Sequence, residues 1–182
     1  MALEDVGQYF RNWDRKSFEV VACKGNEPSE ADVADFEAYV GFRLPEEFRE
    51  FTMSPLGGLY MAVREELWTR PQEGQAGPAW SFEYGIMVFG IAATIPEWLD
   101  IRVQYLEFRQ EGFPELVPFL RVECDADRYC FDSEGHIIKW DHEEPDEREP
   151  LALSFSELLM REIRELEVRR DRKVRGEDKK PR

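Results

Sequence analysis

One segment constrains the fold more than any other, because it alternates short β-favouring runs with turns. Residues 116–123, 128–131 and 136–140 are rich in apolar and aromatic side chains. Two turn-rich segments, Asp-Ala-Asp at 125–127 and Asp-Ser-Glu-Gly at 132–135, separate these runs. Connections this short join antiparallel strands, whereas parallel strands need a crossover of about a dozen or more residues. The segment therefore predicts an antiparallel meander of three strands.

Strong helix signals lie on both sides of this meander. Ser29 with Asp32, and Ser154 with Glu157, have the spacing of a capping box, which satisfies backbone N–H groups at a helix start. Apolar residues follow both starts at three- and four-residue steps, which indicates amphipathic helices. Gly41 follows the first of these helices at the position of a C-cap glycine.

The remaining sequence predicts further elements of both kinds. The order of elements is helices first, a sheet in the middle and a closing helix, which is typical of an α+β domain. The predicted fold is N-terminal helices and a C-terminal helix packed on a central antiparallel or mixed β-sheet. The further segments are helices at 2–15, 45–55 and 96–109, and strands at 18–23, 59–63 and 84–92.

The length of 182 residues suits one domain, which we place at residues 1–168. Hydrophobic residues make up 42% of the chain, too many for a disordered protein. Residues 169–182 differ, because Val174 is their single apolar side chain and a glycine and a proline interrupt them. We expect this segment to be a basic, disordered tail.

Charge limits the partners of such a chain. It carries 39 acidic and 24 basic residues, a formal net charge of −15. Residues 169–182 hold eight basic and three acidic side chains, so their net charge of +5 leaves −20 on the first 168 residues. Phosphates would be repelled by this charge, which argues against nucleic acid or an anionic membrane as partner. A basic protein is the natural complement.

The sequence predicts a cytoplasmic protein. Its three cysteines, Cys23, Cys124 and Cys130, are too few and odd in number for a disulfide framework, and they suit a reducing cytosol. Residues 1–10 lack the basic start and apolar run of a signal peptide. The longest apolar stretch, residues 84–95, is shorter than the roughly twenty residues of a membrane helix.

A series of short motifs resembles the SUKH superfamily, which includes bacterial immunity proteins and a fungal cell-wall assembly regulator. The similarity covers residues 29–163 and lies in the order and spacing of the motifs. A helix with a Phe-Glu pair leads through Gly and Leu-Pro to a second helix, then a Gly-Gly turn, a strand ending in Phe-Gly and a strand ending in Phe-Asp. In this chain these motifs are Phe36-Glu37, Gly41, Leu44-Pro45, Gly57-Gly58, Phe89-Gly90 and Cys130-Phe131-Asp132 with Gly135.

The resemblance implies a non-enzymatic cytosolic immunity protein that binds a cognate toxin and neutralises it by occlusion. Many secreted toxin domains act on nucleic acid and are basic, so a nuclease-like domain would be attracted by the acidic body. The alternative is an intracellular protein-binding scaffold or regulatory module of the same fold. An enzyme is the third alternative. The sequence does not indicate the oligomeric state.

Two groups of residues are candidates for contact with a protein partner. Trp68 and Trp80 border a long loop, and tryptophan is enriched at interface hot spots, although a tryptophan there often only covers the core. The loop at residues 141–149 is acidic and would attract a cationic partner, although most such loops are merely solvated. Its candidate contact residues are Glu143, Glu144, Asp146 and Glu147.

We expect no metal site, cofactor or catalytic residue. Cys124, Cys130, His136 and His142 recur every six residues, whereas compact zinc sites place two ligands two to four residues apart. The acidic residues of the two turns lack the glycine and closing glutamate of a calcium loop and are explained by turn chemistry. The chain also lacks a G-x-S-x-G motif and a glycine-rich phosphate loop.

Overall fold

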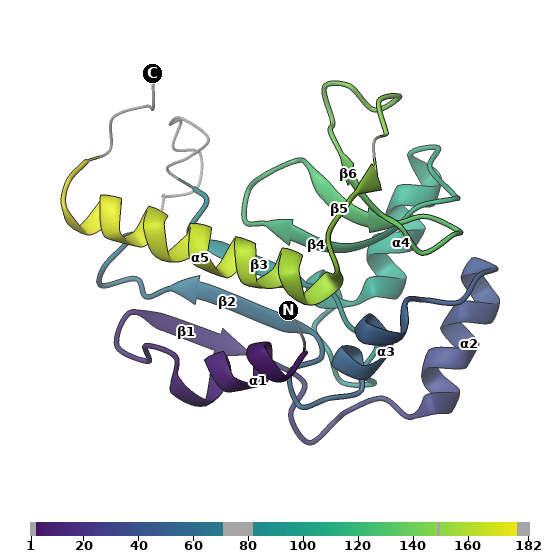
Figure 1. The fold of residues 1–182 in the computed structure, drawn as a ribbon, viewed down its shortest axis with the longest axis horizontal. Helices are drawn as coiled ribbons and strands as arrows, with labels where there is room; N and C mark the ends of the chain where they lie inside the picture. The colour runs from purple at the N-terminus through teal and green to yellow at the C-terminus, as the bar shows by residue number, and fades with distance from the viewer. Residues whose placement is uncertain (1–2, 71–81, 149, 178–182) are drawn as a thin grey trace.

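The computed structural model describes residues 3–70, 82–148 and 150–177. Its centre is a seven-stranded antiparallel sheet in which each strand pairs with the next strand along the chain (Figure 1). The predicted meander forms β4 to β6, and the α+β class is confirmed. The strands are β1 (Phe18–Val21), β2 (Leu59–Val63), β3 (Gly85–Val88), β4 (Val117–Val122), β5 (Arg128–Phe131), β6 (Ile137–Trp140) and β7 (Pro150–Leu151).

Helices cover both faces of this sheet. The long C-terminal helix contacts β3 and two of the N-terminal helices, whereas the helix before β4 contacts β4 from the other face (Figure 1). A short 3-10 helix, η2, precedes that second helix. The helices are α1 (Leu3–Asn12), α2 (Glu30–Val40), α3 (Glu46–Thr52), η2 (Glu97–Leu99), α4 (Ile101–Gln110) and α5 (Phe155–Val174).

The main core is built around Phe48 of α3, which is fully buried. Its ring lies 5.7 Å from Phe119 of β4, 5.1 Å from Phe131 of β5 and 5.2 Å from Phe155 of α5, measured between ring centroids. Phe119 and Phe131 stack on each other at 3.9 Å. One side chain therefore joins α3, the sheet and α5.

A smaller core lies on the opposite face, beneath α4. Phe108 of α4 packs edge-on against Trp140 of β6 at 4.8 Å, and Cys130 of β5 belongs to the same buried cluster. Cys130 and Phe131 are neighbours in β5, and successive side chains in a strand point to opposite faces. The sheet is therefore buried between α3 with α5 on one face and α4 on the other.

Arg49 fixes α2 to α3. Its side chain is only 3% exposed and forms ion pairs with Glu30 and Glu37, both on α2. Glu37 also accepts a hydrogen bond of 2.8 Å from the backbone N–H of Leu44 in the α2–α3 connection. Removing one partner of such a buried pair would leave an uncompensated charge, which is strongly destabilising. Glu37 of the Phe-Glu motif thus ties α2 both to α3 and to Leu44 of the Leu-Pro motif.

The predicted starts of α2 and α5 and the predicted end of α2 are confirmed, because capping interactions between nearby residues fix them. Both capping boxes are present, with Ser29 and Asp32 bonded to each other's backbone N–H groups and Ser154 and Glu157 doing the same. Gly41 ends α2 in the left-handed conformation with φ of 88°, which glycine adopts without a steric penalty.

Two predicted elements differ from the structure. The helix expected at 96–109 is divided, because Asp100 pairs in a parallel bridge with Gly90 and caps the start of α4. The tail expected from residue 169 does not begin there, since α5 continues to Val174. Arg170 of this segment is part-buried, lying 3.3 Å from Asp14 and 5.0 Å from the ring of Phe18.

Two glycines are required where backbone segments approach closely, one between the end of α3 and the turn before β2, the other between that turn and the residues after β3. A Cβ on Gly57 would lie 2.1 Å from the carbonyl oxygen of Thr52. A Cβ on Gly90 would lie 2.5 Å from the backbone nitrogen of Gly58. Real Cβ atoms do not make contacts this short, so any side chain at these positions would force the backbone segments apart.

We predict that Gly90→Ala lowers the free energy of unfolding by about 2 kcal/mol, the range expected for overpacking against backbone. The matched control is Gly7→Ala in α1, where the added Cβ would meet only the end of the Arg11 side chain at 3.6 Å. Alanine is favoured over glycine within a helix, so the control should unfold at the same or a higher denaturant concentration. Equal stability of the two variants in urea would contradict the close-approach explanation.

Candidate partner-binding surface

The acidic loop between β6 and β7 is anchored at its base. Arg148 forms an ion pair with Glu115, donates a hydrogen bond of 3.2 Å to the carbonyl of Pro145 and lies 5.3 Å from the ring of Phe113. Phe113 and Glu115 belong to the connection between α4 and β4. The loop is therefore held against the C-terminal end of α4.

The four acidic side chains predicted as contact residues are all exposed. No ion pair between described residues neutralises any of them. They are Glu143, Glu144, Asp146 and Glu147. The structure thus presents four exposed carboxylates on an anchored loop.

Asp127 forms a small charge network beside this loop. Its two oxygens lie 2.7 Å from Nζ of Lys139 and 2.9 Å from Nδ1 of His142. Partial burial opposes ionisation of Asp127, but the hydrogen bonds from Lys139 and His142 hold the pKa of its carboxyl below the usual value. The hydrogen bond to Asp127 in turn raises the pKa of His142.

Three side chains of the kinds that bind metal ions lie close together beside the loop. They are not the cysteine and histidine set considered from the sequence. Asp127, Asp141 and His142 each offer a ligand atom, all within 4.8 Å of one another. The ammonium group of Lys139 and the ring of His142 already contact the two oxygens of Asp127. The arrangement is explained by an ion-pair network.

Of the two tryptophans predicted as partner contacts, the structure describes Trp68 alone. Trp68 is 3% exposed, and its ring contacts that of Tyr84 edge-on at 6.4 Å while Nζ of Lys173 lies 5.4 Å from its centroid. Its ring therefore covers the core, and the role of Trp68 as a partner anchor stays a prediction. Trp80 lies outside the described residues.

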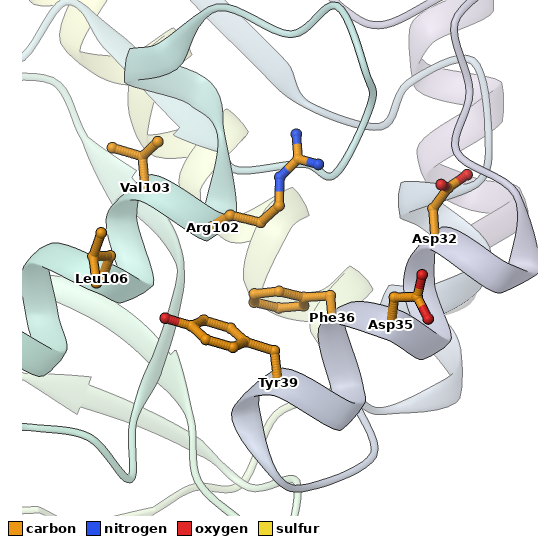
Figure 2. A pocket seen from close by; sticks show the side chains of 7 residues that line it. All are labelled: Asp32, Asp35, Phe36, Tyr39, Arg102, Val103 and Leu106. Carbon is orange, nitrogen blue, oxygen red and sulfur yellow. The ribbon is translucent and has the colours of Figure 1, made fainter.

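A groove between α2 and α4 is a surface feature that the sequence did not predict (Figure 2). Its volume is about 430 Å³, and Figure 2 shows the rings of Phe36 and Tyr39 extending from α2 toward α4. The apolar stripe of α2 indicates Phe36 as a core residue, but Tyr39 lies off that stripe. The lining residues are Asp32, Asp35, Phe36, Tyr39, Arg102, Val103 and Leu106.

The floor of this groove is apolar and fixed. Phe36 is buried and meets the ring of Tyr105 edge-on at 6.2 Å. Tyr39 meets the same ring at 5.6 Å but remains 50% exposed, and Leu106 opposite it is 44% exposed. Large apolar side chains held in the open on two facing helices are a common feature of protein contact sites.

The charges of the groove are divided between its two helices. Arg102 on α4 is neutralised locally, because its guanidinium contacts both carboxylate oxygens of Asp100, at 2.7–3.1 Å. Asp32 on α2 accepts hydrogen bonds from Ser29, which lower its pKa. Asp35 is exposed and forms no ion pair with another described residue.

A second cleft, of about 710 Å³, lies between α1, β1 and α3 and is mainly apolar. Its walls include Phe10, Trp13 and Phe51. The amphipathic pattern of α1 predicts that Phe10 and Trp13 face inward, but it does not predict that a cleft remains beneath them.

We predict that Asp127→Asn lowers the pKa of His142, because the variant loses the carboxylate that stabilises the charged ring. Histidine ordinarily titrates near pH 6.5, and its pKa is raised here. The stability that this pair contributes should be complete below about pH 6.5 and be lost as pH rises through the raised value.

Titration of the His142 ring by NMR measures this effect directly. The control is Asp132→Asn, which removes a carboxylate 3.1 Å from the other histidine, His136, and should leave the His142 midpoint unchanged. An identical His142 midpoint in wild type and Asp127→Asn would show that the ion pair does not form in solution.

In the described part of the chain, no helix is both long and apolar enough to span a membrane.

Comparison with known proteins identifies the family. No curated protein matches the sequence. The model of the SMI1 / KNR4 family (SUKH-1) matches residues 27–161, a segment that contains the α2–α4 groove and the acidic loop. Because this match covers well over half of the chain and agrees with the motifs and the α+β fold, the protein belongs to the SMI1 / KNR4 (SUKH-1) family.

Proposed function

We propose that this protein is an immunity protein that binds a cognate toxin domain and neutralises it by covering its active site. Membership of the SMI1 / KNR4 family carries the proposal, since that family comprises immunity and regulatory proteins that act by binding. The toxin that best fits the charge of the chain is a basic domain acting on nucleic acid.

Charge supports this choice of partner. A nucleic-acid-cleaving domain binds phosphates through lysine and arginine side chains. The exposed carboxylates of the acidic loop carry the same sign of charge as phosphates and could occupy the same cationic surface. Their attraction over distance would also speed the encounter.

The raised pKa values of the cysteine thiols support a non-catalytic role. Burial raises the pKa of Cys23 and Cys130 above the usual value, and partial desolvation with the charge of Glu123 raises that of the exposed Cys124. The thiolate is the nucleophilic form of cysteine, so these thiols are poorly suited to catalysis at neutral pH. Both histidines are exposed and paired with carboxylates in turns, which explains their positions without a reaction.

The test is coexpression with a toxin domain encoded beside the gene for this chain, once such a domain has been identified. We expect growth to be rescued and the purified proteins to form a complex. Association should slow as salt rises, because exposed charges are screened beyond about 8 Å at physiological ionic strength. Absence of both rescue and complex would overturn the proposal in favour of an intracellular scaffold, and a salt-independent on-rate would overturn its electrostatic part.

We predict that reversing charge in the acidic loop, with Glu143→Lys and Glu144→Lys together, lowers the association rate constant about tenfold, since rim charges act mainly on the on-rate. The matched control is Glu65→Lys with Glu66→Lys, an exposed adjacent pair after β2 that changes net charge equally. Surface plasmon resonance at low salt measures both variants. Equal slowing in both would mean that only net charge matters and that the loop does not face the partner.

A further inference from the structure

The α2–α4 groove has the features of a site for one long cationic side chain. Its apolar walls are formed by Phe36, Val103 and Leu106, which would contact an aliphatic stem. Arginine and lysine bury such stems against apolar surface while the charged head stays at a polar rim. A purely apolar side chain would leave the carboxylates at the rim unused.

The charge at the rim selects a cation. Asp35 is exposed and has no ion-pair partner among the described residues, and Asp32 lies one helical turn before it on the same helix (Figure 2). Arg102 is the one cation in the lining, and Asp100 binds its guanidinium through both oxygens. The charge of Arg102 also acts on Asp32, so Asp35 is the carboxylate left for a guest. A guest cation would therefore meet an unneutralised carboxylate at the α2 side of the groove.

Tyr39 favours arginine over lysine. Its ring is 50% exposed and is held by its edge-to-face contact with Tyr105, so little side-chain entropy remains to be lost on binding. A guanidinium stacks on aromatic rings and binds a carboxylate through two parallel hydrogen bonds, which an ammonium group cannot do. Tyr39 and Asp35 lie one turn apart on α2 and both line the groove, so the groove offers both kinds of interaction.

We propose that the α2–α4 groove binds a single arginine side chain from the cationic surface of the toxin, and that this contact is separate from the acidic loop. This inference rests on the proposed function for the identity of the partner. The acidic loop attracts the toxin over distance, whereas the groove holds one of its side chains and slows dissociation. Both surfaces adjoin α4, so one partner can reach both.

The first experiment needs no toxin. The full chain, labelled with ¹⁵N and ¹³C, is titrated with N-acetyl-arginine methylamide and, separately, with the neutral isostere N-acetyl-citrulline methylamide. We expect saturable NMR shifts at Tyr39 and Leu106 with the arginine probe in the millimolar range, and binding of the citrulline probe weaker by about tenfold. Equal binding of the two probes, or shifts confined to residues 141–147, would overturn the inference.

Variants locate the contact. Asp35→Asn should weaken the arginine probe about tenfold, and Asp146→Asn in the acidic loop, which makes the same change of charge, should leave it unchanged. Both positions are exposed, so neither variant should alter the melting temperature. Equal affinity of the two variants for the probe would place the arginine elsewhere.

The second experiment separates this inference from the proposed function. In the toxin complex, Asp35→Asn and Tyr39→Ala should speed dissociation, while the loop variants slow association. If the toxin binds but neither the probe nor the dissociation rate responds to Asp35→Asn, the groove assignment is wrong and the immunity function stands. If the probe binds as expected but no toxin complex forms, the groove is an arginine site and the proposed partner is wrong.

Discussion

The contacts of α3 hold the sheet, the C-terminal helix and α2 together. Phe48 packs against strands β4 and β5 and against α5, so it joins the sheet to the C-terminal helix. The next residue, Arg49, holds α2 through a buried ion pair with Glu37. Because the two side chains leave α3 in different directions, this seven-residue helix fixes both the core and the position of α2. The groove between α2 and α4 exists only because α2 is held in this place.

Helix α4 connects the two surfaces assigned to partner binding. It supplies Arg102 and Leu106 to the groove, and the connection that follows it supplies Phe113 and Glu115 to the base of the acidic loop. The helix is itself anchored to the sheet through Phe108 and its neighbours on β6. A partner that contacts both surfaces would therefore meet a rigid frame, which lowers the entropic cost of association.

Local chemistry made much of this fold predictable. The capping boxes at Ser29 and Ser154 and the turns between β4 and β6 depend on residues a few positions apart, and the sequence placed them correctly. The break at Asp100 depends on a bridge to Gly90, a contact between segments that no local pattern shows. The groove escaped prediction for the same reason, since facing helices create it. The composition of the sequence was enough to identify the acidic loop. The burial of Trp68 is known only from the tertiary structure.

The last strand of the sheet limits how other chains can associate with it. Strand β7 has only two residues, and the first, Pro150, has no backbone N–H to donate to a further strand. Exposed edges of sheets otherwise act as templates for strand addition, which leads to aggregation or domain swapping. At this edge almost no backbone N–H and C=O groups are free to pair with a strand of another chain. Recognition beside the acidic loop must therefore proceed through side chains, where charge and shape discriminate between partners.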